Sequence, residues 1–283
     1  MQKKYDYRTI VISDVHLGTA GSKAIEATKF IRDYTCERLI LNGDIIDGWQ
    51  LKKYGAWKKK HTAFIRAVLK TIEKDDTQVY YVRGNHDDFL DQFLPFSVGS
   101  NFKIVQELVL NSGENKFFVT HGDVFDLVTK KAKWLAHIGD LGYTALLWFN
   151  KKYNQYRVFK GKPYYSLSKK VKNSIKMAVN YISDFEEQLS EMAKSKGCNG
   201  IICGHIHQPA IKTIDNIKYM NSGDWIENKS ALVEDYSGNW EIVYDASHLN
   251  NDSLDELPIE FDVDMEEPDR EFEESYSHIF ELK

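Results

Sequence analysis

Cysteine is scarce in this sequence, and long apolar runs are missing. The 283 residues include three cysteines, an odd number without CxxC spacing, which excludes a disulfide framework and favours a reduced cytosolic protein. Cys203 lies inside an apolar run, so we expect it in the core. No stretch approaches the roughly 18 apolar residues of a membrane-spanning helix. The first ten residues lack the apolar segment of a signal peptide, so we expect a cytoplasmic protein.

Charge is unevenly distributed along the chain. Residues 250–283 hold 13 acidic and 2 basic side chains, whereas residues 126–180 hold 12 lysines and arginines against two aspartates. Because such an acidic, apolar-poor segment cannot build a core, we expect a mobile tail at 250–283. Residues 1–249 predict one domain of ordinary size, with a helical insertion at about 124–196.

Short apolar runs rich in β-branched and aromatic residues predict five strands. They lie at 9–13, 38–42, 78–82, 116–120 and 200–203. Their near-continuous apolarity is typical of strands that are buried on both faces. Helical patterns at 22–34 and 58–74 separate the first three, which indicates an α/β fold. Later runs at 217–221, 230–235 and 240–244 favour a mixed or second sheet. Apolar residues three or four positions apart predict one long helix over 166–196.

A polar, metal-capable motif follows each of the five strands. The motifs are DVH at 14–16, GD at 43–44, GNHD at 84–87, HGD at 121–123 and GHIH at 204–207. Ligands of open α/β sheets bind outside the carboxyl ends of strands, so all five motifs can meet in one crevice. Imidazole nitrogens with carboxylate and amide oxygens, and no thiolate, suit divalent metals of borderline hardness. The sequence therefore predicts a metal site.

The order of these motifs resembles that of the calcineurin-like metallophosphoesterases. The resemblance implies a two-sheet α/β/β/α sandwich that binds two divalent metal ions, with Asp44 bridging them. The implied ligands of one ion are Asp14, His16, Asp44 and His207. Those of the other are Asp44, Asn85, His121 and His205. His86 is implied to be a general acid or a stabiliser of the transition state.

Two such ions would suit hydrolysis of a phosphoester. They would clamp the attacking and leaving oxygens and lower the pKa of a bound water. Mn²⁺ is the expected ion from the mixed nitrogen and oxygen ligands, with Zn²⁺ or iron as alternatives. His86 cannot easily share a metal with Asn85, because adjacent side chains point apart, so it is available for proton transfer. Arg83 precedes this loop and could reach a phosphate or form a surface salt bridge.

A narrower resemblance concerns the substrate. The stretches GDIIDGW, WLAHIGDLGY, GKPYYSLS and NSGDWIENKSALVE are similar to bacterial proteins grouped with the UDP-2,3-diacylglucosamine pyrophosphohydrolases. The resemblance implies cleavage of a lipid-linked pyrophosphate in lipid A synthesis, at the inner membrane face. Members of that class often carry Arg where this chain has His86. A leaving alkoxide needs an acid more than a leaving phosphate does, so simple phosphate esters and diesters stay open.

The basic middle segment indicates how an anionic substrate is held. Lysines occupy the first half of the predicted long helix and acidic residues the second, against the preference of the helix dipole. Nine aromatic residues lie between positions 134 and 165. We predict a lid that contacts a lipid-linked substrate or an anionic membrane through Arg157, Lys169, Lys172 and Lys176. A solvated basic face over an aromatic mini-core is the alternative, and nucleic-acid binding is less favoured.

Two rival functions remain at this point. One is an enzyme that acts on soluble nucleotides or other phosphate esters. The other is a scaffold that kept the fold and lost catalysis. The metal-ligand set is complete in this sequence, which favours an enzyme over the scaffold. The oligomeric state is left open by the sequence.

Overall fold

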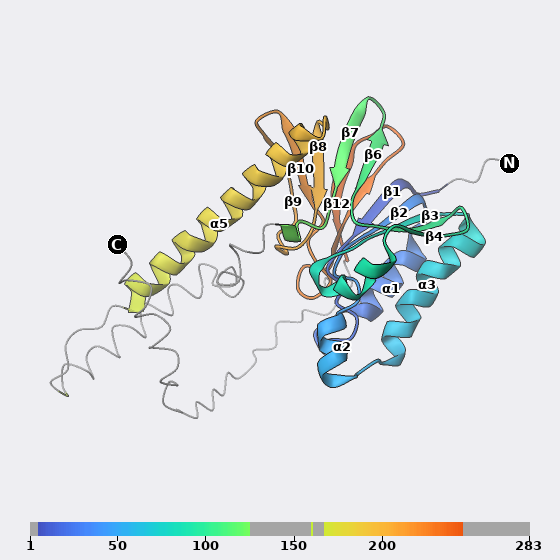
Figure 1. Cartoon of the computed structure of the whole chain (residues 1–283), viewed down its shortest axis with the longest axis horizontal. Helices are drawn as coiled ribbons and strands as arrows, with labels where there is room; N and C mark the ends of the chain where they lie inside the picture. Colours follow the sequence, from blue (N-terminus) through green and yellow to red (C-terminus); the bar gives the residue numbers. More distant parts are fainter. Residues whose placement is uncertain (1–4, 125–159, 161–166, 246–283) are drawn as a thin grey trace, which may run out of the picture. The chain divides into compact units, whose positions relative to one another are not determined.

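The computed structural model describes residues 5–124, 160 and 167–245; over 167–180 it describes only the course of a helix. These residues belong to one unit of the chain, Met1–Asp245 (Figure 1). Most of the predicted insertion, and the whole of the predicted acidic tail at 250–283, lie outside them. The tail and its mobility therefore stay predictions.

Two mixed β-sheets make up the centre of the described part. One sheet has the strand order β12-β11-β1-β2-β3-β5-β4. Its strands are β1 (Tyr7–Ile12), β2 (Cys36–Asn42), β3 (Gln78–Val82), β4 (Phe96–Val98), β5 (Phe102–Val105), β11 (Ser230–Glu234) and β12 (Trp240–Tyr244). The other sheet has the order β6-β7-β8-β10-β9. Its strands are β6 (Leu108–Ser112), β7 (Asn115–Val119), β8 (Gly200–Cys203), β9 (Ala210–Ile214) and β10 (Ile217–Asn221).

The two sheets pack face to face through alternate side chains. Val11 of β1 and Ile40 of β2 are buried in one cluster with Val119 of β7 and Ile202 of β8. The intervening residues of β1, such as Ile10, point to the opposite face of their sheet and are buried there as well. This two-sided burial is what the continuous apolar runs predicted, and each such side chain contributes roughly 1.5–3 kcal/mol.

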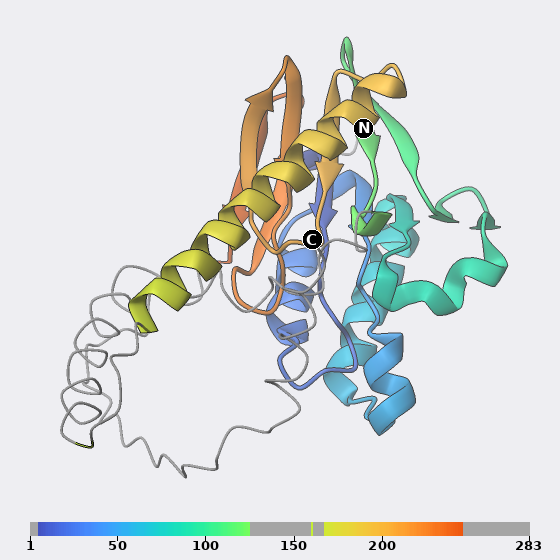
Figure 2. The same cartoon turned by 60° about the vertical axis from the view of Figure 1, so that its left-hand side comes forward.

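Helices cover the outer face of each sheet (Figures 1 and 2). The first sheet is covered by α1 (Ala24–Asp33) and α3 (Lys59–Asp75), which bury Phe30 and Phe64 against it. The second is covered by α5 (Leu167–Ser195) through Phe185 and Leu189. The predicted α/β/β/α sandwich and the long helix are thus confirmed. None of the described helices is long and apolar enough to cross a membrane.

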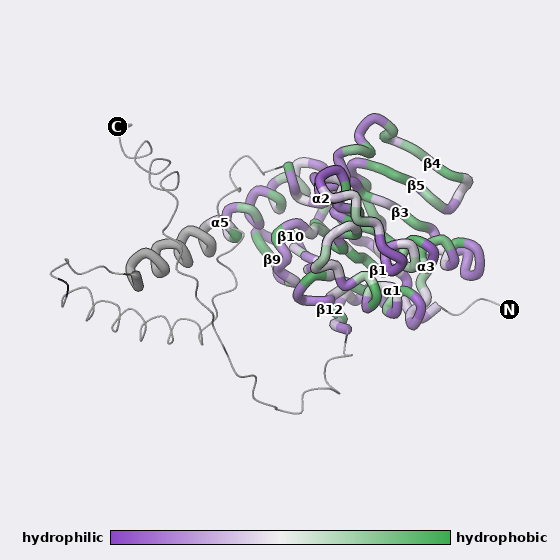
Figure 3. Tube along the Cα trace, turned by 90° about the horizontal axis from the view of Figure 1, so that it is seen from below, coloured by the Kyte–Doolittle hydropathy of each residue, from purple (hydrophilic) through white to green (hydrophobic). Residues whose placement is uncertain are grey.

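Several short elements were not predicted. They are α2 (Gly48–Tyr54), the 3₁₀ segment η1 (Asn85–Phe93), and the strands β4, β5, β6 and β9. β4 has three exposed residues, and β9 has no fully buried one, so neither carries the apolar pattern of a central strand. Apolar and polar stretches alternate along the described chain, as the green and purple parts of the tube show (Figure 3). All three cysteines are buried and free, and Cys203 lies in a core cluster as predicted.

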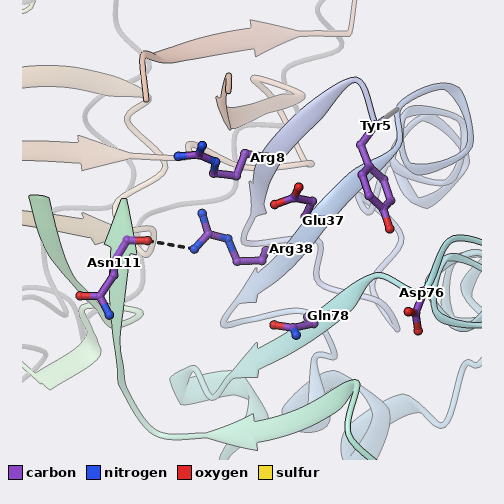
Figure 4. A pocket seen from close by; sticks show the side chains of 7 residues that line it. All are labelled: Tyr5, Arg8, Glu37, Arg38, Asp76, Gln78 and Asn111. Carbon is purple, nitrogen blue, oxygen red and sulfur yellow. Dashed lines mark hydrogen bonds between the residues drawn. The ribbon is translucent and has the colours of Figure 1, made fainter. Parts of the chain in front are cut away.

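A buried carboxylate, Glu234, joins strands of both sheets at the edge opposite the motif loops. It accepts hydrogen bonds from the Thr9 and Ser112 hydroxyls and pairs with Arg38 at 2.9 Å. Arg38 also donates to the main-chain oxygen of Asn111 (Figure 4). Arg38 lines a cavity of about 500 Å³ at the start of β1, β2 and β3. This cavity is therefore at the other end of the strands from the predicted metal site.

Replacement of Glu234 by alanine should lower the free energy of unfolding by about 3–5 kcal/mol, because it leaves a largely buried guanidinium without its partner. Urea denaturation followed by circular dichroism measures this. Glu234→Gln keeps the side-chain shape and one acceptor oxygen, so it should be less destabilising. A loss of only about 1 kcal/mol for Glu234→Ala would mean that the pair behaves as a surface ion pair.

Candidate metal centre

Parallel strands from both sheets end at one edge, and this brings the five motifs together. β1, β2 and β3 run parallel in one sheet, and β7, β8 and β10 run parallel in the other. Main-chain hydrogen bonds then tie the loops to each other. The Asp14 N–H donates to the Gly43 oxygen at 3.0 Å, and the His205 N–H donates to Asp14 Oδ2 at 3.1 Å. The second of these bonds connects the two sheets at the site.

The backbone of the motifs is strained where the ligands lie. The five residues Asp14, His16, Asp44, His205 and His207 all have a positive φ, between +47° and +70°. This left-handed region disfavours residues with a side chain, and it persists only where the surrounding structure enforces it. Strain of this kind clusters at functional sites. Its concentration at these residues supports a functional site.

Gly84 is required by close approach of two motifs. A Cβ at this position would collide with the main-chain nitrogen and the carboxylate of Asp44. The glycine therefore lets the loop of β3 lie directly against the loop of β2. There the His86 N–H donates to Asp44 Oδ1 at 2.8 Å, which fixes the carboxylate.

The predicted ligands form two adjoining groups. Asp14, His16 and His207 offer ligand atoms within 4.8 Å of one another, and Asp44, His121 and His205 do the same. In the first group, His207 Nε2 lies 3.1 Å from Asp14 Oδ1. In the second group, His121 Nε2 lies 3.3 Å from Asp44 Oδ2. The same Asp44 oxygen is 3.7 Å from His16 Nε2, so Asp44 lies between the groups, where a bridging ligand belongs.

The donor atoms fit divalent metal ions. Among the described residues, His16 Nε2 and Asn85 Oδ1 are buried and have no hydrogen-bond partner, an expensive state that a cation would relieve. His121 Nδ1 lies 2.8 Å from the Asn42 carbonyl oxygen, so Nδ1 carries the proton that is donated. That bond leaves Nε2 as the atom available to a metal, the arrangement usual for histidines that bind metals.

Opposite charges stabilise one another in this cluster. Burial alone would raise the pKa of Asp14 and of Asp44. Neighbouring histidines nevertheless hold both pKa values below the usual range, chiefly His207 for Asp14 and His121 for Asp44. Burial likewise opposes charge on His121, yet Asp44 and Asp14 raise its pKa to about 10. The carboxylates are therefore ionised in the folded chain, as metal binding requires.

His86 lies beside the two groups, and its ring offers an atom within 4.8 Å of the ligand atoms of His16 and Asp44. Its Nε2 lies 3.9 Å from Asp44 Oδ2, and its Nδ1 lies 3.1 Å from Asp47 Oδ2. The ring packs on Trp49, with 4.3 Å between the centroids. Asp47 also accepts from His16 Nδ1 at 3.3 Å and caps α2 through the Gln50 N–H. Burial would raise the pKa of Asp47, but His16 and His86 keep it below its usual range.

Asp47 and Asp87 support the site in ways that the sequence did not reveal. Asp47 lies three residues after Asp44 in the sequence, but its contacts with the rings of His16 and His86 depend on the fold. Asp87 ends the GNHD motif and accepts from the Tyr81 hydroxyl at 2.7 Å and the Ile46 N–H at 2.9 Å. Burial, and then Asp44, raise the pKa of Asp87 to about 7. Asp87 thus anchors the His86 loop to the Asp44 loop.

Of the predicted substrate contacts, Arg83 is the one whose side chain is among the described residues. Arg83 pairs with Asp91 through two bonds, 2.6 and 2.9 Å long, and also with Asp123. These carboxylates raise the pKa of its guanidinium despite partial burial. A phosphate would therefore reach Arg83 only if a pair opened. Arg157 lies outside the described residues, as do the side chains of Lys169, Lys172 and Lys176.

The chain is similar to known phosphoesterases. The family model of the calcineurin-like phosphoesterases matches residues 7–209. A UDP-2,3-diacylglucosamine hydrolase from Wigglesworthia glossinidia brevipalpis is 23% identical over 232 residues, 80% of this chain and 89% of that protein. An archaeal phosphodiesterase structure (14% identity, TM-score 0.40) covers 83% of this chain and 98% of its own. The phosphoesterase Yfce from E. coli (15%, TM-score 0.35) covers 83% and 97%. The chain belongs to the calcineurin-like phosphoesterase family and is a metal-dependent phosphoester hydrolase.

Proposed function

We propose that this protein hydrolyses a phosphoester or pyrophosphate bond in a lipid-linked or sugar-lipid-linked substrate such as UDP-2,3-diacylglucosamine. The observation that carries the proposal is the similarity to the Wigglesworthia hydrolase, which extends over four fifths of the chain. The complete pair of metal-ligand groups supports a catalytic protein over a scaffold. The proposed cofactors are two divalent ions, with Mn²⁺ first and Zn²⁺ or iron as alternatives.

We assign Asp14, His16, Asp44 and His207 to one ion, and Asp44, Asn85, His121 and His205 to the other. Bound ions of this kind supply Lewis-acid activation of water and of the phosphoryl group. The chain itself contributes His86. With Nδ1 turned to Asp47, the imidazole directs Nε2 toward the Asp44 side of the site. There it can donate a proton to a leaving oxygen, which typically accelerates such reactions by 10²–10⁴-fold.

The runner-up is a phosphodiesterase or phosphatase that acts on soluble nucleotides. Two observations favour it. His86 is suited to a leaving alkoxide, which needs protonation, and exposed Trp49 beside it offers a flat surface to a base or aryl group. Protonation matters less when the leaving group is a phosphate.

A substrate panel separates these functions. Purified protein with Mn²⁺ is assayed on UDP-2,3-diacylglucosamine, a lysophospholipid phosphate, cyclic nucleotides and an aryl phosphodiester. Preference for the first, by kcat/KM, supports the proposal. Preference for a nucleotide supports the runner-up. If the metal-bound protein hydrolyses none of these phosphoesters, the result favours a scaffold without catalytic activity.

We also propose that the basic half of α5 contributes to a lid over the substrate, on the inner membrane face. Lys172→Glu/Lys176→Glu should raise KM for a lipid-linked substrate, because two favourable charge contacts become repulsive. Contacts far from the reacting bond can also assist the chemical step, so kcat for the lipid-linked substrate either falls or stays constant while KM rises. Turnover of a small aryl phosphodiester should hardly change. Equal kinetics of variant and parent on every lipid-linked substrate would contradict the lid.

A further inference from the structure

A basic and aromatic surface lies beside the metal centre, on α2 and the turn into α3. Residues 48–72 hold seven lysines and arginines and no acidic residue. Five of these are lysines within the nine residues 52–60. We call the surface of this segment the basic–aromatic turn. Its members are Lys52, Lys53, Tyr54, Trp57, Lys58 and Lys59.

The basic–aromatic turn is exposed, although its backbone is well fixed. Tyr54 and Trp57 are 65% and 43% exposed, and the four lysines are exposed as well. α2 ends at Tyr54, and the next residue, Gly55, caps the helix with a φ of +64°. Trp57 Nε1 donates to Thr62 Oγ1 at 2.8 Å, which holds the indole in place. Since α2 has no fully buried residue, these side chains do not serve the core.

The placement of the lysines is costly for the isolated fold. Lys58 is the N-cap residue of α3, Lys59 and Lys60 follow it, and the first turn of α3 contains no acidic residue. The positive end of a helix dipole disfavours cations. Lys60 gains a partner in the Ser22 carbonyl oxygen at 2.6 Å, but Lys58 and Lys59 stay on the surface. An anionic partner would compensate the like charges.

We propose that the basic–aromatic turn docks this protein on an anionic phospholipid bilayer. Clustered lysines are attracted to anionic headgroups, and Tyr and Trp side chains settle at headgroup depth. η1 packs on α2 through Phe89 and Gly48, and it presents exposed Phe89 and Phe93. Rings without a polar tip fit a lipid interface better than a nucleic-acid backbone, which is why lipid is favoured.

Docking at this surface brings a bilayer next to the reaction site. Trp49, on the same α2, packs on the His86 ring, and Asp47, the N-cap residue of α2, contacts His16 and His86. A substrate anchored in the membrane would then meet the metal centre without leaving its lipid. The docking does not depend on the proposed substrate, because vesicle binding is measured without any hydrolysis.

The test is cosedimentation of the full chain with vesicles of equal parts phosphatidylglycerol and phosphatidylcholine. The parent should bind these vesicles and not pure phosphatidylcholine, and added salt should weaken binding. The triple variant Lys52→Glu/Lys53→Glu/Lys59→Glu should bind roughly 10²-fold more weakly, since each lysine near an anionic surface contributes severalfold. A matched control, Lys103→Glu/Lys116→Glu/Lys194→Glu, changes the net charge equally at exposed positions elsewhere.

The outcomes discriminate sharply. Loss of binding in the triple variant alone, with unchanged melting temperature and unchanged hydrolysis of a soluble aryl phosphodiester, supports the docking surface. Tyr54→Ser in the parent should also weaken vesicle binding, and the binding that is left should keep its dependence on salt. Equal binding by parent, triple variant and control, or failure of the parent to bind, overturns it. Binding of RNA through the same lysines without vesicle binding would overturn it in favour of nucleic acid. A parent that binds vesicles but hydrolyses nothing contradicts only the proposed function.

Discussion

Replacing Asp44 with alanine should remove bound metal and abolish measurable hydrolysis. Asp44 Oδ2 lies within 3.3–3.9 Å of His121, His16 and His86, so this carboxylate belongs to both ligand groups. Its loss removes one of the two negative charges that attract the cations. Loss of a residue that merely supports a ligand already costs about 10–100-fold in affinity or activity, so loss of a shared ligand should exceed this.

Metal analysis of the purified variant, beside its kinetics, measures this effect. Asp44→Asn is the matched control, because it keeps the shape and one oxygen while it removes the charge. It should retain more metal than Asp44→Ala and less than the parent. Asp235→Ala, at a half-buried carboxylate in the β11–β12 turn, should bind as much metal as the parent. If Asp44→Ala kept a full complement of metal, the assignment of Asp44 as shared ligand would be wrong.

The convergence of the motifs could be predicted because it follows from strand direction. Apolar runs that end in polar motifs place their side chains at the carboxyl edge of a parallel sheet. β1, β2 and β3 obey this rule in one sheet, and β7 and β8 obey it in the other. The rule does not say that the two sheets share one edge. The bond between the His205 N–H and Asp14 Oδ2 reveals that join, and it depends on how the sheets pack.

The support of the site could not be predicted, because it depends on local backbone geometry. His16 and Asp44 take a left-handed conformation, which histidine and aspartate adopt more often than most residues do but which nothing in their motifs marks at these positions. Asp47 contacts both His16 and His86 as the N-cap residue of α2, and α2 has no buried apolar stripe from which the sequence could predict it. The sequence also left two interpretations of Arg83 open. Its partner Asp123 follows β7 of the other sheet, so the pair depends on how the two sheets pack.

Replacing His86 with alanine should leave the metal content intact and lower kcat by roughly 10²-fold or more. The contacts of the ring explain both parts of this expectation. His86 is held by Asp47 on one side and by the Trp49 ring on the other, and Asn85, not His86, is assigned to the metal. Its main-chain bond to Asp44 Oδ1 survives the change, so the shared ligand keeps its orientation.

The leaving group distinguishes between the two roles open to His86. A general acid matters most for a poor leaving group, so the loss in kcat should be larger for an alkyl ester than for an aryl ester. A histidine that only stabilises charge on the phosphoryl oxygens would give equal losses. His61→Ala, at a buried histidine packed on Trp57 away from the site, controls for the loss of an imidazole. If His86→Ala lost metal to the same extent as Asp44→Ala, His86 would be a ligand and the proton donor would have to be another group.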